Sequence, residues 1–418
     1  MSQDNSPSLP EPKESTTVLV VGAGATGLAL AQGLKKAGIP CVVVEKHCNL
    51  DTPSRDWNMG LHWGAGPLKS LLPEELWARL PLVQVDPSKL PDEKDALPFV
   101  NSQSGESMAS IPVPVFYRLR RRKLRGLLGE GLDVQYGKAL DTIEYSTNGG
   151  HSKAVFEDGS SLLARLIIGA DGARSKTRLG LLGPTIGQPR RLPYCATFVQ
   201  ARYSADRARF LRQFHPLYLA GINPAGYVSF FGVQDASDRD RPETWTFFFY
   251  ISRYSSLQEQ QETAGWNNSQ RLEQVREFSK AFADPWKSAF EWLPDDHPVW
   301  YMSLADFDPR LKDHRWDNHD GQVTLAGDAA HVMTYQRGQG LNHSITDAAN
   351  LVEAVKRFLS GTSTQADAIS EYETEMIHRA GGEANLSTLN TEMLHDWQRV
   401  LQSPIFTSGL TGRARGSD

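Results

Sequence analysis

The chain has 418 residues, of which 40% are hydrophobic and 22% are charged, and its formal net charge is −5. This length exceeds a single compact core and predicts two domains, or one domain with a large insertion. The slightly acidic balance lacks the strongly basic surface with which proteins bind nucleic acids, so we expect no nucleic-acid partner.

Cysteine usage and the N-terminus point to a soluble protein of a reducing compartment. Cys41, Cys48 and Cys195 are too few for a disulfide framework, and none lies in a CxxC pair or at metal-ligand spacing, so we expect a cytoplasmic setting and no metal. Residues 1–16 are polar and rich in proline, which predicts a disordered tail rather than a signal peptide. No stretch has the roughly 18 apolar residues of a membrane helix, so we expect no membrane partner.

A βαβ unit is predicted next. The apolar run TVLVVG at residues 17–22 has the pattern of a buried parallel strand, and a helical pattern follows over residues 25–38. The run IPCVVVEK at residues 39–46 predicts a second buried strand. Strand, helix and strand within about 30 residues form a unit whose crossover is expected to be right-handed.

The remaining chain alternates between helical and β-type patterns. We predict a helix over 67–80, a strongly cationic helix over 117–128 and mainly helices over 341–402. Residues 190–305 are β-type and aromatic, with a polar helical stretch near 256–292.

One aromatic strand shows the alternation clearly. In WTFFFY, Trp245, Phe247 and Phe249 share one face, and Phe248 and Tyr250 share the other. We expect most of these rings in the core of a sheet, and one face is a candidate wall for an apolar substrate pocket.

These patterns predict an α/β fold with a discontinuous, Rossmann-like domain for a cofactor, an inserted β-sheet domain for a substrate, and C-terminal helices. The cofactor domain comprises residues 17–80, 113–185 and 306–418. The substrate domain comprises residues 81–112 and 186–305.

The first functional motif joins the two N-terminal strands. Gly22, Gly24 and Gly27 form GxGxxG between strand and helix, and Glu45 ends the next strand. In a dinucleotide site these glycines allow a tight turn, approach of a pyrophosphate and close helix packing, while the acidic side chain accepts hydrogen bonds from a ribose. The motif predicts a dinucleotide site and leaves FAD and NAD open. The alternative is a tight turn with no ligand.

Two further segments carry a resemblance to a known family. LIIGADGARSKTR, residues 166–178, contains Asp171 and Gly172, and LAGDAAHVMTYQRGQGLN, residues 325–342, contains Asp328. Together with GxGxxG, and in the same order, they resemble the signatures of the single-component (group A) FAD monooxygenases, the flavoprotein hydroxylases similar to para-hydroxybenzoate and salicylate hydroxylase. The resemblance covers nearly the whole chain after the tail.

The resemblance implies roles for individual residues. Asp328 would bind the ribityl chain of FAD, Arg121 of RRKL would reach the pyrophosphate, and Asp171 would support FAD and the handling of NAD(P)H. The residues that the motif and the resemblance together place against FAD are Gly22, Gly24, Ala25, Thr26, Gly27, Glu45, Lys46, Arg55, Met59, Arg121, Asp171, Gly172, Asp328, Gly338, Gly340, Leu341 and Asn342.

Other polar residues near these motifs allow two interpretations. The basic neighbours of Arg121 are expected on a solvated helix face; they are Arg118, Arg120, Arg122, Lys123 and Arg125. His62 and Trp63 lie in the loop of residues 55–64 that would cover the cofactor, and either cofactor contacts or plain packing fit them.

The chain departs from the family beside the expected flavin ring. Prolines are frequent after GDAAH in the family, but Val332, Thr334 and Tyr335 stand at those places here, with Arg337 just beyond. Tyr335 and Arg337 are therefore the candidate catalytic residues, since a phenol and a guanidinium can orient a substrate oxygen or stabilise an oxyanion. The alternative is that Tyr335 packs and Arg337 pairs with a surface carboxylate.

The resemblance implies a monooxygenase with FAD as cofactor and NADPH or NADH as co-substrate. O2 would add to the reduced flavin to give a C4a-hydroperoxide, whose terminal oxygen would hydroxylate an aromatic or other electron-rich small molecule. Similarity to fungal secondary-metabolism members suggests a polyketide, terpenoid or alkaloid substrate, and we expect a monomer or homodimer. A flavin-dependent epoxidase or oxidase, and a flavin-binding module without turnover, are the alternatives.

Overall fold

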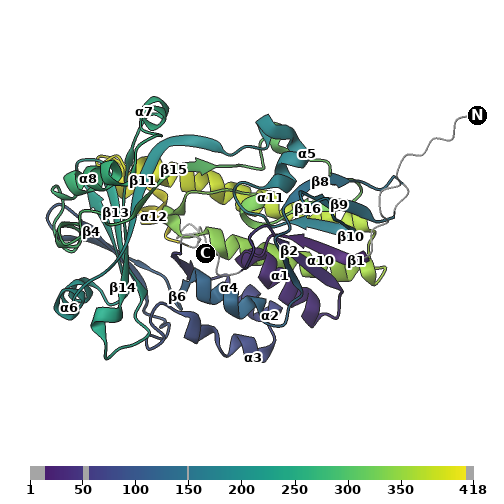
Figure 1. Ribbon diagram of the computed structural model, residues 1–418, viewed down its shortest axis with the longest axis horizontal. Coiled ribbons are helices and arrows are strands. Elements are labelled where there is room, and N and C mark those ends of the chain that lie inside the picture. The colour runs from purple at the N-terminus through teal and green to yellow at the C-terminus, as the bar shows by residue number, and fades with distance from the viewer. Residues whose placement is uncertain (1–14, 50–55, 148–149, 411–418) are drawn as a thin grey trace, which may run out of the picture.

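Two sheets, each in its own lobe, organise the computed structural model (Figure 1). The structure describes residues 15–49, 56–147 and 150–410. Helices and both parallel and antiparallel strands are present, so the predicted α/β class is confirmed.

The first sheet is mostly parallel. Its strands are β1 (Ser15–Val21), β2 (Cys41–Glu45), β7 (Val134–Tyr136), β8 (Leu140–Glu144), β9 (Ser152–Phe156), β10 (Ser161–Gly169) and β16 (Val323–Leu325). They run in the order β7-β2-β1-β10-β9-β8, and β16 lies beside the carboxyl half of β10. β1 begins at Ser15, and Ser15 and Thr16 pair with β10, so these two residues belong to the sheet rather than to the predicted tail.

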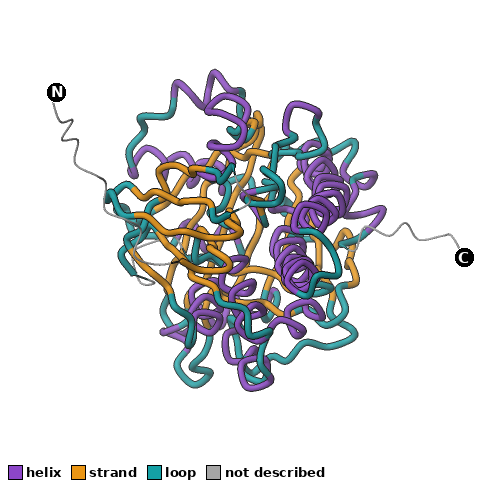
Figure 2. The backbone as a smooth tube through the Cα atoms, turned by 90° about the vertical axis from the view of Figure 1, so that its right-hand side faces the viewer, coloured by secondary structure: helices purple, strands orange, loops and turns teal. Residues whose placement is uncertain are grey.

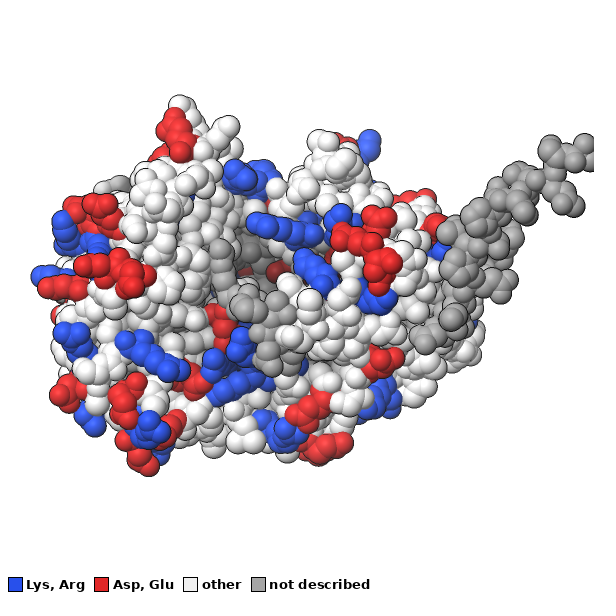
Figure 3. Space-filling view, viewed as in Figure 1, with Lys and Arg blue, Asp and Glu red and all other residues white. Residues whose placement is uncertain are grey.

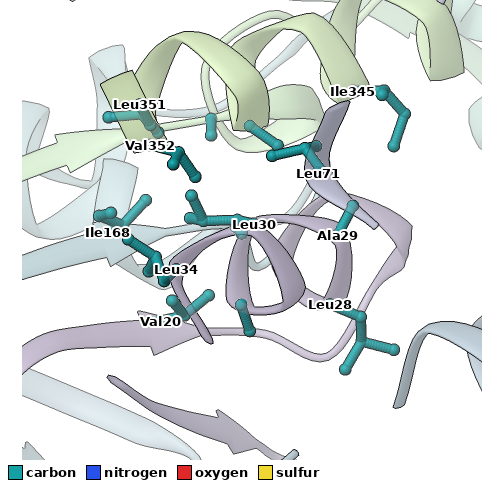
Figure 4. Packing of buried hydrophobic residues seen from close by; sticks show 14 of the residues in the cluster. Val20, Leu28, Ala29, Leu30, Leu34, Leu71, Ile168, Ile345, Leu351 and Val352 are labelled. Carbon is teal, nitrogen blue, oxygen red and sulfur yellow. The ribbon is translucent and has the colours of Figure 1, made fainter. Parts of the chain in front are cut away.

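Helices cover this sheet through an apolar interface. Helix α1 (Ala25–Lys36) packs between the sheet and α10 (Gly340–Leu359), next to α2 (Ala65–Leu71). Figure 4 shows Leu30 and Leu34 of α1 clustered with Ile168 of the sheet, beneath Leu351 of α10. All four side chains are buried, which makes this layer the centre of the largest hydrophobic core.

The second sheet is mostly antiparallel. Its strands are β4 (Ala96–Asn101), β5 (Ser107–Pro112), β11 (Arg190–Arg202), β12 (Tyr218–Asn223), β13 (Tyr227–Asp235), β14 (Thr246–Tyr254) and β15 (Val299–Asp306). They run in the order β15-β11-β14-β13-β12-β4-β5, with β12 and β4 parallel. Helices α6 (Ala205–Phe214), α7 (Leu257–Glu262), α8 (Asn268–Ser279) and α9 (Trp286–Glu291) belong to the same lobe.

The two faces of β14 pack into different cores, as its alternation predicts. Phe247 and Phe249 join the core that includes residues of α8 and α9. Phe248 and Tyr250 join the core on the opposite face, which also contains Tyr335 and residues near the C-terminus. The second face is therefore the one that looks toward the first lobe.

A short two-stranded sheet connects the lobes. It consists of β3 (Asn58–Leu61) and β6 (Tyr117–Arg120), and β6 leads directly into helix α4 (Arg121–Gly129). The single helix predicted over residues 117–128 is therefore wrong in its first four residues. Residues 117–120 pair in register with β3, and pairing overrides the helical propensity of their arginines.

The predicted solvated face of this cationic segment is also wrong for three side chains, those of Arg118, Arg120 and Arg125. The Arg118 guanidinium lies among aromatic rings, 5.1 Å from the centre of Phe230. Arg120 pairs with Asp56 and with Asp235, which joins the short sheet to the second lobe. Arg125 is buried and donates from Nε to the carbonyl of Ala23 at 2.9 Å. A run of basic residues favours a solvated helix face when it is read alone, because the sequence does not show which distant carboxylates and carbonyls accept from these side chains.

Long helices complete the fold and link the lobes. Helix α11 (Gln365–Leu394) packs along α10 and runs from one lobe to the other (Figures 1 and 2). The remaining helices are α3 (Glu74–Trp77), α5 (Lys176–Ile186) and α12 (Pro404–Ser408), with short 3₁₀ turns over 80–83, 242–244, 312–314, 327–329, 335–337 and 400–402. Among the described residues, no helix combines the length and apolar character needed to cross a bilayer.

Shortening one buried leucine side chain of α1 tests this packing. We predict that Leu30→Ala lowers the free energy of unfolding by about 2–5 kcal/mol, since Leu30 is fully buried and the cavity cannot collapse between two rigid elements. Urea denaturation followed by tryptophan fluorescence measures the change. Leu82→Ala is the matched control, because Leu82 is 60% exposed and its loss is expected to change stability by less than about 0.5 kcal/mol.

Candidate functional site

Three strands of the first sheet end together and place the three motifs at one edge. Val21 at the end of β1 is in register with Gly169 at the end of β10, and Gly169 is in register with Leu325 at the end of β16. All three strands are parallel, so the turns that follow them emerge on the same side. The carboxyl edge of a parallel sheet is where open α/β folds bind ligands.

Glycine is required at different positions of the first motif for different structural reasons. A Cβ on Gly22, whose φ is +110°, would lie 2.5 Å from the carbonyl oxygen of Ala170, and one on Gly27 would lie 2.0 Å from that of Gly22. These two positions permit close backbone packing. A Cβ on Gly24 would meet nothing closer than 4.0 Å, so the backbone there faces open space at the start of α1. The first turn of α1 has no side-chain cap, which leaves its N–H groups available to an anion.

Glu45 is held beside this turn as a carboxylate. Its Oε2 accepts from the backbone N–H of Ala23 at 2.9 Å, and its Oε1 accepts from the N–H of His47 at 3.1 Å. Burial raises the pKa of Glu45, but hydrogen bonds from the backbones of His47 and Ala23 and from the His47 ring outweigh it and leave the pKa lower than usual. A carboxylate accepts up to about four hydrogen bonds, so these contacts leave capacity for a ribose hydroxyl.

Asp171 of the second motif organises the turn into α5. One carboxylate oxygen accepts from the Ser175 hydroxyl at 2.5 Å, and the other accepts from the backbone N–H of Thr177 at 3.1 Å. Gly172 adopts φ +79°, in the left-handed region that favours glycine. In this structure the Asp171 side chain therefore shapes the loop beside the cleft.

Arg178 ties the second motif to the third. It is fully buried, and its guanidinium donates to the carbonyls of Ala173 at 2.5 Å and Ala329 at 2.7 Å. Burial lowers its pKa to about 10, against the opposing charges of Asp171 and Asp328. The sequence predicts no role for Arg178, although the residue lies within the second motif, because backbone acceptors leave no mark in the sequence.

A buried carboxylate fixes the third motif. One oxygen of Asp347 accepts from the backbone N–H of Gly327 at 2.7 Å and contacts Nε2 of His331 at 2.6 Å, and the other accepts from Arg379 at 2.8 Å. Burial alone would raise the pKa of Asp347, but His331 and Arg379 hold it well below its usual range. Asp347, which the sequence analysis did not single out, thus anchors the residue before Asp328.

Asp328 lies on the wall of a cleft. Its side chain is accessible to solvent, yet the surrounding protein desolvates the carboxyl and raises its pKa, against the charges of His331, Arg178 and Arg121. The negative charges of Glu45 and Asp328 both act to raise the pKa of Arg121. The Arg121 guanidinium lies 4.7 Å from the centre of the Trp57 ring. Figure 3 shows a hollow between the lobes, with lysine and arginine side chains along part of its rim.

The start of α10 faces the strand β3 across this cleft region. The Asn342 side chain accepts from the N–H groups of His62 at 3.0 Å and Gly64 at 3.1 Å, and it donates to the carbonyl of Gly60 at 3.2 Å. Within the described part of the chain, the side chain of the N-cap residue Gln339 does not cap the first turn of α10. Its free N–H groups, which include those of the Gly340 and Leu341 backbone, are suited to stabilise negative charge on a ligand.

Trp63 and His62 both pack beside the start of α10, and Trp63 also forms a hydrogen bond there. The Trp63 indole donates to Oε1 of Gln339 at 2.9 Å. His62 lies edge-on to Phe116, and burial together with the charge of Arg337 lowers its pKa to about 4, so the ring stays neutral.

The two candidate catalytic residues occupy different environments. The Tyr335 ring lies edge-on to Tyr250, with 5.0 Å between centroids, and its hydroxyl faces Ser252 without reaching hydrogen-bonding geometry. Arg337 is fully buried, and its Nε donates to Glu383 at 2.6 Å. The alternative interpretation paired Arg337 with a carboxylate at the surface. Its carboxylate partner is instead the buried Glu383.

The structure brings most predicted cofactor residues to the one edge. Thr26 lies against Gly327, where a Cβ would be 2.6 Å from the threonine hydroxyl, so the first and third motifs touch. Ala25 and Met59 are partly buried near the cleft, Gly338 adopts φ +63° before α10, and Lys46 is exposed at the end of β2. Arg55 lies outside the described residues.

These features fit FAD. The open backbone at Gly24 and the uncapped α1 suit a pyrophosphate, Glu45 suits a ribose, and the cleft-wall carboxylate of Asp328 suits the ribityl hydroxyls. The aromatic face of the second sheet packs against Tyr335, in the turn that precedes α10.

Known proteins share this arrangement. A family model described as FAD binding domain matches residues 15–55 and 101–383. The FAD-dependent monooxygenase cctM of Talaromyces islandicus is 36% identical over 400 residues, which are 95% of this chain and 97% of that protein. The FAD-dependent monooxygenase phnB of Penicillium herquei is 34% identical over 398 residues, or 94% and 95% of the two chains.

A solved structure agrees in fold. Klebsiella pneumoniae HpxO complexed with FAD and uric acid superposes with a TM-score of 0.72 at 20% identity, and the match covers 96% of this chain and 94% of that chain. Fold and family together define a flavoprotein that binds FAD. The chain belongs to the FAD binding domain family, and it is an FAD-dependent monooxygenase. The predicted family and the predicted cofactor FAD are confirmed.

Two glycine variants separate a role in folding from a role in binding. Gly24→Ala is expected to fold normally but to weaken FAD binding by about tenfold, comparable to one charge-assisted hydrogen bond of about 1.5 kcal/mol. Gly27→Ala is expected to lower the yield of folded protein, because its Cβ would overlap the Gly22 carbonyl. Fluorescence titration of apoprotein with FAD measures the affinity. Gly66→Ala, exposed and without close neighbours, is the control, and equal affinities for Gly24→Ala and wild type would contradict the assignment.

The charge of Asp347 gives a prediction about pH. A carboxyl whose pKa is lower in the folded chain stabilises the fold above its unfolded value of about 3.9 and loses that effect as pH falls through the folded value. Asp347→Asn is therefore expected to cost about 3–5 kcal/mol of stability, equally at pH 5 and pH 8. Urea denaturation of both proteins at both pH values measures this. A difference that shrinks from pH 8 to pH 5 would show that Asp347 takes up a proton in that range.

Proposed function

We propose that the protein uses NAD(P)H and O2 to hydroxylate an aromatic or other electron-rich small molecule. The reaction consumes one NAD(P)H, one proton and one O2, inserts one oxygen atom into a C–H bond of the substrate, and releases water and NAD(P)⁺. When bound, FAD supplies the redox chemistry that connects these reactants. The names of the relatives cctM and phnB, both fungal FAD-dependent monooxygenases, support a role in secondary metabolism.

One observation carries the proposal: the FAD cleft and an aromatic sheet face adjoin at the start of α10. Asn342 holds Gly60 of β3, and the Arg118 guanidinium on the neighbouring strand β6 lies 5.1 Å from the centre of the Phe230 ring in the second sheet. A flat substrate bound against those rings would lie next to the flavin ring. Apolar walls exclude water from the reacting atoms, and protein dipoles then act more strongly.

The proposed residue roles follow the geometry. Arg121 and the backbone of Gly24 to Gly27 would hold the pyrophosphate, Glu45 a ribose, and Asp328 the ribityl chain. The backbone from Gly338 to Asn342 would face the pyrimidine edge of the flavin, where helix N–H groups stabilise negative charge.

Tyr335 and Arg337 take different parts in the proposal. Burial raises the pKa of Tyr335 well above its usual value, so its phenol stays neutral and would donate a hydrogen bond to a substrate oxygen. Arg337 is engaged by Glu383 and by the carbonyl of Gly409, so we assign it to positioning the turn that carries Tyr335.

Product analysis tests the proposal. FAD-loaded protein is incubated with NADPH or NADH, ¹⁸O2 and a panel of phenols, polycyclic aromatics and alkenes. We expect substrate-stimulated oxidation of the nicotinamide and one ¹⁸O atom in a hydroxylated product, detected by mass spectrometry. An epoxide product identifies an epoxidase, hydrogen peroxide without an oxygenated product identifies an oxidase, and FAD binding without turnover identifies a binding module.

Tyr335→Phe separates a catalytic hydroxyl from packing. The ring remains, so folding and FAD loading are expected to match wild type, while kcat/KM falls about 5- to 30-fold, the effect of one hydrogen bond of about 1–2 kcal/mol. Steady-state kinetics with the best substrate of the panel measures the change. Unchanged kcat/KM would assign Tyr335 to packing alone.

A further inference from the structure

A half-buried arginine lies among aromatic rings between the two lobes. The Arg118 guanidinium on β6 is 5.1 Å from the ring centre of Phe230 and 5.9 Å from those of Phe116 and Tyr218. Phe230 stacks on Tyr250 with 5.7 Å between centroids, and Tyr250 in turn meets Tyr335. The cation therefore sits at one end of a continuous aromatic wall.

Unlike the side chains of Arg120 and Arg125, this guanidinium has no polar partner among the residues that the structure describes. Arg120 pairs with Asp56 and Asp235, and Arg125 donates to a buried carbonyl. Arg118 forms no hydrogen bond and no ion pair with any residue in 15–49, 56–147 or 150–410, and its Nε is buried. Burial lowers its pKa to about 10, with only the phenols of Tyr218 and Tyr250 opposing the effect. The guanidinium is still charged at neutral pH and is poorly compensated.

The position of Arg118 is fixed relative to the cofactor strand. Arg118 is in register with Gly60 of β3, and a Cβ on Gly60 would lie 3.5 Å from Nη1 of Arg118. The carbonyl of Gly60 is held by Asn342 at the start of α10. One short strand thus separates the cation from the helix start that faces the flavin site.

We propose that Arg118 determines substrate specificity by binding an aromatic substrate through a negatively charged oxygen, a phenolate or a carboxylate. The inference rests on the proposed function for the reaction, but the binding it describes needs no turnover. The flat ring of the substrate lies along the wall formed by Phe230 and Tyr250, and its oxyanion receives hydrogen bonds from the guanidinium. A guanidinium offers several donors in one plane, which matches both kinds of oxyanion.

A neutral analogue of the same shape leaves the cation without a partner. Removing one member of a buried, charged hydrogen bond costs more than the bond itself contributes, so methylation of the anionic oxygen is expected to weaken binding strongly. The wall alone contributes apolar contact that both analogues share. The ratio of the two affinities therefore isolates the contribution of Arg118.

Matched ligand pairs test the proposal in FAD-loaded protein without NAD(P)H. The pairs are 2-naphthol with 2-methoxynaphthalene and 2-naphthoate with methyl 2-naphthoate, and dissociation constants come from the change in flavin absorbance. For wild type we expect the acidic member of at least one pair to bind about 10- to 100-fold more tightly than its methylated partner. The pair that shows the preference distinguishes a phenolate from a carboxylate.

Arg118→Met is expected to abolish this preference while it retains binding of the methylated ligands and FAD loading. Arg118→Lys keeps the charge and is expected to restore part of the preference. Arg122→Met, which changes an exposed arginine four residues further along, is the control and is expected to behave as wild type.

Three results would overturn the proposal. They are no preference for an acidic ligand in wild type, a preference that persists in Arg118→Met, and an Arg118→Met protein that loses FAD affinity as well, which would assign the residue to the cofactor. Failure of the oxygenation reaction alone would count against the proposed function and not against this one, because the affinities are measured without turnover.

Discussion

The alignment of three parallel strand ends is the constraint on which the site depends. β1, β10 and β16 come from positions about 150 residues apart in the chain, yet Val21, Gly169 and Leu325 lie side by side in the sheet. The turns after them carry Gly22, Asp171 and Asp328. A ligand that spans the edge meets all three turns at once, so the hydrogen-bond register of a sheet determines the layout of a dinucleotide site.

Buried polar contacts convert this alignment into a fixed geometry. Arg178 joins the second turn to the backbone of the third, Arg125 holds the carbonyl of Ala23 after the first, and Asp347 holds the N–H of Gly327. These side chains are buried, and in these contacts their hydrogen-bond partners are backbone groups. They fix the loops at the edge where Asp328 is exposed to solvent.

Sequence predicted the elements with strong periodicity and the motifs with local signatures. The apolar runs of β1 and β2 and the glycine spacing required no knowledge of distant contacts, and the alternation in β14 correctly separated Phe247 and Phe249 from Phe248 and Tyr250. Residues 117–120 were predicted as helix because helix-favouring arginines dominate locally, whereas pairing with β3 decides their conformation. The internal partners of Arg125 and Arg337 were missed for a related reason. Ala23 and Glu383 lie 102 and 46 residues away in the chain, and no local pattern reports such pairs.

The central claim is that the carboxyl edge of the first sheet binds FAD through the three turns. A crystal structure of the protein with FAD tests it most directly. The account predicts the pyrophosphate at the backbone of Gly24 and near Arg121, a ribose hydroxyl on Glu45, and the ribityl chain on Asp328. Electron density for FAD at another place, or FAD at this edge without contacts to Gly24 and Asp328, would contradict it.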